Sequence, residues 1–255
     1  MFHQISTYLQ HRFSSNNRHG IHSPFVYEFV DKVLYTSMDQ VAYEKLQRLI
    51  TSYKKDKTGL KQSGFGAGSK RSLNTVSDVA SVSSSPIKKA SLLNRIVSFY
   101  EFENILELGT NLGVACYAMA IAKHNPRLHS IEGNEEFAKI AQGTMEQEQL
   151  NRVSIENASF ESVLPDVLRN NKFDLVFVDG DHSYEATMKY FRSILPSLHN
   201  ESMLILDDIY WSPEMTKAWR EIQAFDEVKV SLDLYHLGIL LFRKEMTPER
   251  FRIRF

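Results

Sequence analysis

Four short apolar runs in this chain each end in acidic residues, and helical patterns lie between the runs. Such an alternation of strands and helices predicts a parallel sheet with helices packed on its faces. Open parallel sheets bind ligands at the carboxyl ends of their strands, so the acids predict a ligand site at one sheet edge. The acids at the four ends are Glu107, Glu132, Asp179 and the pair Asp207 and Asp208.

The same patterns set the expected order of the elements. Two apolar runs near the end of the chain, 228–234 and 238–242, are too close together for a helical crossover. They should therefore pair antiparallel as a hairpin. The expected fold class is α/β, with a doubly wound sheet of seven strands whose last strand is reversed. Further strands are expected at 104–109, 127–132, 153–157, 173–179 and 202–207, with helices such as 135–150 and 184–198 between them.

The first part of the chain differs in composition from the rest. Residues 56–86 are rich in Gly, Ser and Lys and are expected to form a flexible loop. The stretch Gly64–Arg71 looks like a glycine-rich cofactor loop, but no apolar strand precedes it, which favours a plain flexible loop, with a lid or an anion-binding nest as the alternatives. We expect a helical N-terminal extension with this loop over 1–86, and the main domain over 87–255.

Residues 1–60 have the pattern of amphipathic helices. Pro24 suits the first turn of a helix, and Ser23 is placed to cap that helix. An apolar stripe runs along this segment and needs a surface to cover it, so we expect these helices to pack on the main domain and to help enclose an acceptor site. The stripe consists of Phe25, Phe29, Val33 and Leu34.

Composition fits one sizeable α/β domain with an appendage, at 255 residues of which 43% are hydrophobic. No apolar stretch approaches the roughly 20 residues that a membrane helix needs, and the N-terminus lacks the features of a signal peptide. A cytoplasmic protein with no membrane partner is therefore expected. The single cysteine, Cys116, excludes an internal disulfide and a cysteine-built zinc site.

Charge is distributed unevenly along the chain. Residues 1–100 hold 14 Lys and Arg against 6 Asp and Glu, whereas the remainder holds 16 against 25. A basic appendage can bind an anionic substrate or nucleic acid, or it can attract the acidic domain or simply be solvated. The last two explanations are favoured, and nucleic acid is not expected as a partner because no nucleic-acid-binding module is present.

The glycine turn after the first strand indicates the class of cofactor. Dinucleotide folds need G-x-G-x-x-G to bind a pyrophosphate, but this turn has only Gly109 and Gly113, with Glu107 before them. A carboxylate there would repel phosphates and would suit a cationic amino group. Glu132 ends the second strand, where an acid accepts hydrogen bonds from ribose hydroxyls. A nucleoside that carries an ammonium group and no phosphate describes S-adenosylmethionine.

With these residues the chain resembles the class I S-adenosylmethionine-dependent methyltransferases over about residues 90–245, and the terminal hairpin matches the reversed seventh strand of their Rossmann-like sheet. The resemblance implies that Glu107 contacts the methionine part, that Gly109 allows close approach of the backbone, and that Glu132 holds the ribose. Ala158 and Ser159 fall where the family contacts adenine, although many members have an acid there. The other implied cofactor-binding residues are Thr110, Gly113, Gly133 and Asp179.

Clustered carboxylates at two neighbouring strand ends repel each other unless a cation lies between them. Oxygen ligands suit a hard cation such as Mg²⁺. The residues resemble the metal-dependent O-methyltransferases of small molecules, including the catechol and caffeoyl-CoA type. They match more closely the macrolide-sugar type with its D-G-x-H motif. This resemblance implies that Asp179, Asp207 and Asp208 bind Mg²⁺ or a similar divalent cation and that His182 is the general base.

Other interpretations of the same residues stay open. Acids after strands often cap a turn or helix, although Asp179, His182, Asp207 and Asp208 together favour a metal site. The expected function is methyl transfer from S-adenosylmethionine to a hydroxyl of a small molecule. The alternatives are a nucleic-acid or protein methyltransferase that docks through the basic N-terminal segment, and a non-catalytic cofactor-binding protein. Pairing of two copies through the N-terminal helices also stays open.

Overall fold

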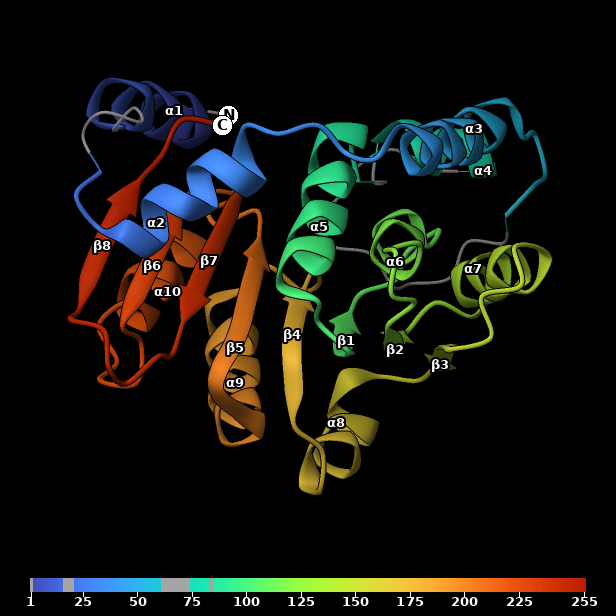
Figure 1. Cartoon of the computed structure of the whole chain (residues 1–255). Helices are drawn as coiled ribbons and strands as arrows, with labels where there is room; N and C mark the ends of the chain where they lie inside the picture. Colours follow the sequence, from blue (N-terminus) through green and yellow to red (C-terminus); the bar gives the residue numbers. More distant parts are fainter. Residues whose placement is uncertain (1, 16–20, 61–73, 83–84) are drawn as a thin grey trace. The chain divides into compact units, whose positions relative to one another are not determined.

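The computed structural model describes residues 2–15, 21–60, 74–82 and 85–255 (Figure 1). The stretch Gly64–Arg71 lies outside the described residues. The chain divides into two compact units, which are described separately. The central unit is Tyr35–Val163, and the terminal unit combines the described residues up to Leu34 with Leu164–Phe255. The boundary at residue 86 that the sequence suggested stays a prediction.

Three parallel strands form the sheet of the central unit. They are β1 (Asn104–Leu108), β2 (Arg127–Glu132) and β3 (Val153–Asn157), in the order β3-β2-β1. The register sets Glu107 of β1 beside Ser130 of β2. The helices are α3 (Gln40–Lys55), α4 (Val76–Val82), α5 (Ile87–Tyr100), α6 (Val114–Ala120) and α7 (Glu135–Gln147), while α8 (Phe160–Arg169) runs across the unit boundary.

The terminal unit contains the antiparallel part of the fold. Its strands follow the order β4-β5-β7-β6-β8, in which β4 and β5 are parallel and β7 is antiparallel to both of its neighbours. The predicted reversal near the end of the chain is therefore confirmed. The strands are β4 (Phe173–Val178), β5 (Leu198–Asp207), β6 (Val230–Asp233), β7 (Leu237–Leu241) and β8 (Glu249–Arg252).

One strand of this unit was not predicted. Strand β8 adds to β6 in parallel, with Val230 opposite Glu249 and Asp233 opposite Arg252. Its sequence, Glu-Arg-Phe-Arg, has few apolar residues, so it lacks the buried-strand pattern that indicated the others. The helices of this unit are α1 (Phe2–Ser14), α2 (Pro24–Phe29) with a π-helical continuation (Val30–Leu34), α9 (Tyr184–Ile194) with a 3₁₀ turn (Leu195–Ser197), and α10 (Pro213–Ile222).

The N-terminal helices form largely as the sequence predicted. Pro24 begins α2, and the carbonyl oxygen of Ser23 accepts a hydrogen bond from the amide of Tyr27 at 2.9 Å. The Ser23 hydroxyl makes no capping hydrogen bond to the described residues, so that part of the prediction was wrong. Phe29 and Val33 are fully buried, as an apolar stripe requires.

The expected loop over residues 56–86 was wrong in part, because α4 occupies Val76–Val82. Oδ2 of Asp78 accepts hydrogen bonds from the amides of Asn74 and Thr75 at the start of this helix. Val76, Val79 and Ala80 are buried. The high serine content of the segment hid this short apolar spacing. No helix of the described residues combines the length and the apolar character that crossing a bilayer requires.

Close packing in the terminal unit is tightest at Gly238 of β7. A Cβ at this position would lie 2.6 Å from the ring of Trp219, a side chain that is 1% exposed, and 2.9 Å from Cγ2 of Ile209. Only a residue without a side chain therefore fits between the strand and α10. Gly143 in α7 has no such neighbour, since nothing lies within 4 Å of its Cβ position.

We predict that Gly238→Ala lowers the free energy of unfolding by about 1–3 kcal/mol, because the added methyl group overpacks the core beside Trp219. The control Gly143→Ala should instead raise stability by up to about 1 kcal/mol, since alanine favours a helix interior. Urea unfolding followed by circular dichroism measures both variants. A Gly238→Ala protein as stable as the unsubstituted protein would contradict the packing at β7.

Candidate functional site

The carboxyl end of β1 holds a chain of three buried polar groups. The Glu107 side chain is fully buried, and its Oε2 accepts a hydrogen bond from Oγ of Ser130 at 2.5 Å. The Ser130 hydroxyl in turn lies 2.5 Å from Oγ1 of Thr110. Oε1 of Glu107 has no hydrogen-bond partner of normal geometry among the described residues. These contacts connect the ends of β1 and β2 through side chains as well as through the strand ladder.

Burial raises the pKa of Glu107 to about 8, with a smaller contribution in the same direction from the charge of Glu132. Ser130 and the nearby Cys116 thiol partly oppose the shift through side-chain hydrogen bonding. The carboxyl group is thus protonated at neutral pH in the protein as described. A cationic group placed beside Oε1 would favour the carboxylate and lower the pKa again.

The turn after β1 uses backbone conformations that few residues adopt. Gly109 has φ 97° and Gly113 has φ 83°, and Asn111 between them has φ 51°. A Cβ on Gly113 would lie 2.8 Å from Cβ of Ala141 in α7, so a larger residue is excluded there. A positive φ at a non-glycine residue such as Asn111 is strained, and tertiary contacts must offset the cost of this strain.

Glu132 holds this turn in place from the end of β2. Its Oε2 accepts a hydrogen bond from the amide of Asn111 at 2.7 Å, and its Oε1 accepts one from the amide of Asn134 at 2.8 Å. Burial raises the pKa of Glu132, while backbone hydrogen bonds, including one from Gly133, oppose the rise. Each carboxylate oxygen has a second lone pair, so Glu132 can still accept hydrogen bonds from a ligand.

The end of β3 lies beside Glu132. The amide of Ala158 donates to the carbonyl oxygen of Glu132 at 3.1 Å, and the Asn157 side chain donates to the same oxygen at 2.8 Å. Ser159 is exposed and contacts Ser162 at the start of α8. The structure thus brings the predicted cofactor residues of this unit to the carboxyl ends of its three strands: Glu107, Gly109, Thr110, Gly113, Glu132, Gly133, Ala158 and Ser159.

In the terminal unit, the predicted base follows β4. Asp179 comes directly after the strand, and its Oδ1 lies 3.8 Å from Nε2 of His182, at the edge of an ion pair. The intervening Asp181 has φ 35° and brings the chain back on itself before Ser183 caps α9. The ring of His182 lies 6.0 Å from the ring of Trp211, measured between centroids.

The second pair of predicted metal ligands ends β5. Because Val178 pairs with Leu206 in the parallel β4–β5 register, Asp179 and Asp207 follow at neighbouring strand ends. The Asp207 residue is 1% exposed, whereas Asp208 is half-buried and has φ 48°. Oδ1 of Asp208 lies 3.9 Å from Nδ1 of His236. Within the described ranges, no three His, Cys, Asp or Glu side chains are grouped in a metal-binding arrangement.

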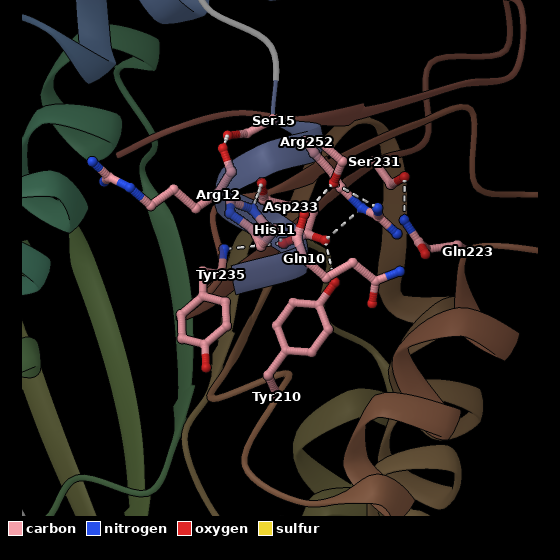
Figure 2. A network of polar contacts seen from close by, with 11 residues as sticks. Gln10, His11, Arg12, Ser15, Tyr210, Gln223, Ser231, Asp233, Tyr235 and Arg252 are labelled. Atoms are coloured by element: carbon pink, nitrogen blue, oxygen red, sulfur yellow. Dashed lines mark hydrogen bonds and ion pairs between the residues drawn. The ribbon is translucent and has the colours of Figure 1, made fainter. Parts of the chain in front are cut away.

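A buried network around Asp233 supports the loop that carries Asp208 and Trp211 (Figure 2). Nε2 of His11 in α1 lies 3.1 Å from Oδ1 of Asp233, and the Tyr210 hydroxyl donates to Oδ2 at 2.6 Å. Burial raises the pKa of Tyr210, and the charge of Asp233 adds to the effect. The network thus connects the Tyr210 side chain, two residues after Asp208, to Asp233 of β6 and through Asp233 to His11 of α1.

Sequence reasoning missed this network entirely. Asp233 ends β6 inside an apolar run, and His11 belongs to a segment more than 200 residues away in sequence, at a separation of 222. The one signal in the sequence was Asp233 itself, an acidic residue within the otherwise largely apolar end of the run 228–234.

Comparisons with known proteins agree with this geometry. A family model described as a methyltransferase domain matches residues 106–209, the segment from the end of β1 to the loop after β5. A search of curated proteins found no match. Solved structures of methyltransferases do match, at identities that show the fold alone.

Three of these structures are similar over most of both chains. The SAH-bound methyltransferase PaMTH1 from Podospora anserina has a TM-score of 0.61 at 14% identity, covering 88% of this chain and 99% of its own. An O-methyltransferase from Bacillus cereus in complex with SAH has a TM-score of 0.54 at 18% identity, covering 85% and 97%. The O-methyltransferase TomG from Streptomyces achromogenes, involved in tomaymycin synthesis and in complex with SAM, has a TM-score of 0.57 at 16% identity, covering 84% and 94%.

The fold is therefore the Rossmann-like methyltransferase fold that the sequence predicted. The segment that the family model matches contains all the predicted cofactor-binding residues, and these structures share its fold. The macrolide-sugar subtype, the metal and the residue roles stay predictions.

Glu107 gives the site a measurable dependence on pH. Because its pKa is raised to about 8 in the folded protein from an ordinary value of 4.5, the folded state binds a proton that the unfolded state releases between these values. Its contribution to stability is therefore present below about pH 4.5 and is lost as the pH rises through 8.

We predict that Glu107→Gln, which cannot ionise, gains stability relative to the unsubstituted protein as the pH rises, by on the order of a few kcal/mol at pH 9. Thermal unfolding without cofactor at pH 5, 7 and 9 measures the difference. The control Glu103→Gln, at an exposed position just before β1, should leave the pH dependence unchanged. Parallel curves for Glu107→Gln and the unsubstituted protein would rule out a neutral buried carboxyl group.

Proposed function

We propose that this protein transfers a methyl group from S-adenosylmethionine to a hydroxyl group of a small molecule. The proposal depends above all on Glu132, whose carboxylate at the end of β2 organises the turn after β1 through the amide of Asn111. This places one ionisable acceptor group, two positive-φ glycines and the end of β3 together at one edge of the central unit. Such an edge suits a nucleoside ligand that carries no phosphate.

The residues present fit S-adenosylmethionine in their chemistry. Glu132 would accept hydrogen bonds from the ribose hydroxyls, and Gly109 and Gly113 would allow close approach of the backbone. Oε1 of Glu107, which has no hydrogen-bond partner of normal geometry among the described residues, would face the cationic end of the methionine part. When bound, the cofactor supplies an electrophilic methyl group on a sulfonium. Thr110, Gly133, Ala158, Ser159 and Asp179 complete the proposed cofactor-binding set.

His182 is the proposed general base. Imidazole as a group gains and loses protons near neutral pH, which suits removal of a hydroxyl proton. With the cofactor bound, Nε2 of His182 would take the proton of the acceptor hydroxyl, so that the oxygen could accept the methyl group that the sulfonium supplies. Asp179, 3.8 Å away, would stabilise the resulting imidazolium. Trp211, which is 47% exposed, offers the acceptor a ring to stack against.

A divalent cation is a separate part of the proposal. Asp179, Asp207 and Asp208 offer oxygen donors at the ends of two neighbouring strands, which suits Mg²⁺ or a similar ion in chemistry and position. Their side chains are not grouped as a ready metal site among the described residues, so binding would require them to turn toward one another. A bound cation would lower the pKa of the acceptor hydroxyl and fix its orientation.

The cofactor assignment predicts a loss of affinity when Glu132 is changed. Titration calorimetry with S-adenosylhomocysteine should show binding to Glu132→Ala weaker by roughly 10-fold to 100-fold, since a charge-assisted contact contributes about 1.5–3 kcal/mol. Glu132→Gln keeps an acceptor for the Asn111 amide, and it should fold well and still bind more weakly. Glu135→Ala, at an exposed position of α7, serves as the control. Unchanged affinity in a folded Glu132→Gln protein would remove Glu132 from the cofactor site.

The base assignment predicts a loss of turnover with little change in cofactor binding. We expect His182→Ala to lower kcat by roughly 10²–10⁴ with vicinal diols or catechols as acceptors. Turnover is measured as the rate at which S-adenosylhomocysteine is formed. His199→Ala is a matched control, because His199 makes a similar pair with Asp174, 3.0 Å apart, near the opposite ends of β4 and β5. Equal kcat values for the His182 variant and the control would exclude His182 as the base.

Chelation tests the metal separately from the base. Dialysis against EDTA should abolish turnover, and added Mg²⁺ should restore it, because the cation activates the acceptor rather than the cofactor. Calorimetry with S-adenosylhomocysteine should therefore change little on chelation. Full turnover in EDTA would remove the metal from the mechanism and would leave His182 as the base of a metal-free transfer.

A further inference from the structure

Helix α1 buries polar residues and exposes apolar ones, which is the reverse of an ordinary surface helix. Its polar residues Thr7 and His11 are 7% and 5% exposed, whereas Ile5, Leu9 and Phe13 are 56%, 47% and 86% exposed. Residues 5, 9 and 13 are four apart and form one line along the helix, which we call the outer stripe. It lies about 200° around the helix from the line of residues 3, 7 and 11.

The inversion is fixed by specific contacts on the inner side of α1. His11 binds both the side chain and the carbonyl oxygen of Asp233, at 3.1 and 3.0 Å, and Asp233 is 2% exposed. The Tyr235 hydroxyl donates to the carbonyl oxygen of Gln4 at 2.6 Å, and His3 lies 2.9 Å from Oγ1 of Thr216. A rotation that buried the outer stripe would remove the contact of His11 with the buried Asp233, and leaving a buried polar group with fewer partners is costly. These inner contacts therefore keep the apolar side of α1 facing outward.

The rim of the outer stripe is basic. Helix α1 contains no Asp or Glu, and the exposed Arg12 lies between Leu9 and Phe13. The last six residues of the chain hold Arg250, Arg252 and Arg254 and no acid. Two of these arginines contact the carboxyl end of α1, since Arg254 donates to the carbonyl oxygen of Arg12 at 3.0 Å and Arg252 to Oγ of Ser14 at 2.9 Å. They also complement the helix dipole there.

We propose that the outer stripe of α1 docks on an anionic lipid bilayer, with Arg12 and Arg254, which contact each other at the carboxyl end of α1, at the level of the headgroups. A helix with an apolar face and a basic rim lies in the membrane interface, and this requires none of the length that a spanning helix needs. The sequence-based expectation of no membrane partner rested on the lack of a spanning segment, and the exposure of Ile5, Leu9 and Phe13 is the observation from which we propose binding to a membrane surface. A second copy fits less well, because a two-fold contact through this face would bring the same arginines of both copies together.

Vesicle sedimentation of the full chain tests the proposal independently of any methyltransferase activity. We expect the protein to sediment with unilamellar vesicles that contain phosphatidylglycerol, and not with vesicles of phosphatidylcholine alone. Leu9→Ser combined with Phe13→Ser should weaken binding by more than about tenfold, because two apolar side chains leave the interface. Arg12→Gln should weaken it roughly fivefold, and raised salt should weaken it further.

Two controls keep the result specific. Val41→Ser changes a side chain in α3 that is 63% exposed, and it should leave vesicle binding unchanged. Thermal unfolding should show all variants folded, because the substituted side chains do not contribute to the core. Failure to sediment with anionic vesicles would overturn the proposal, as would equal binding to neutral vesicles. A dimer in sedimentation equilibrium that Leu9→Ser with Phe13→Ser dissociates would assign the surface to a second copy instead.

Discussion

The hydrogen-bonded chain from Glu107 through Ser130 to Thr110 is the contact on which the proposed cofactor edge of the central unit depends. Two parallel strands must end at the same level for a nucleoside to lie across them. The register of β1 and β2 sets Glu107 beside Ser130, and the buried carboxyl group then connects the strands through side chains. Burial makes this contact sensitive to protonation, since the pKa of Glu107 rises to about 8. The geometry of the edge and its response to charge thus come from one residue.

The terminal unit uses a second buried acid in a comparable way. Asp233 ends β6 and accepts contacts from α1, from the loop after β5 and from β8. The loop contains Asp208 and Tyr210, so the placement of a proposed metal ligand depends on contacts made by the first helix of the chain. Buried charged networks of this kind rigidify a site when every member is satisfied. The N-terminal segment therefore supports, through His11 and Asp233, the loop that carries the proposed metal ligand Asp208.

The same network explains why α1 exposes its apolar residues. A helix normally packs its apolar side inward because burial of that surface stabilises the fold. Here the inner side is occupied by His11 and by contacts to Tyr235 and Thr216, which hold it in one rotation. The outer side of α1 then carries both a basic residue, Arg12, and an exposed apolar residue, Phe13. One set of buried contacts thus determines both the position of the loop after β5 and the outward surface of α1.

Sequence alone determined the strand–helix alternation, the acids at the strand ends, the glycine turn and the terminal hairpin, because each depends on local periodicity or on neighbouring residues. Glu107, Glu132 and Asp179 could be predicted at strand ends because the end of each strand can be located from its own apolar pattern. Tertiary structure alone decided the burial of Glu107, the strand β8 and the contact of His11 with Asp233, which are 222 residues apart. It also decided which side of α1 faces outward, because the helical pattern identifies two sides but not the partner that selects between them.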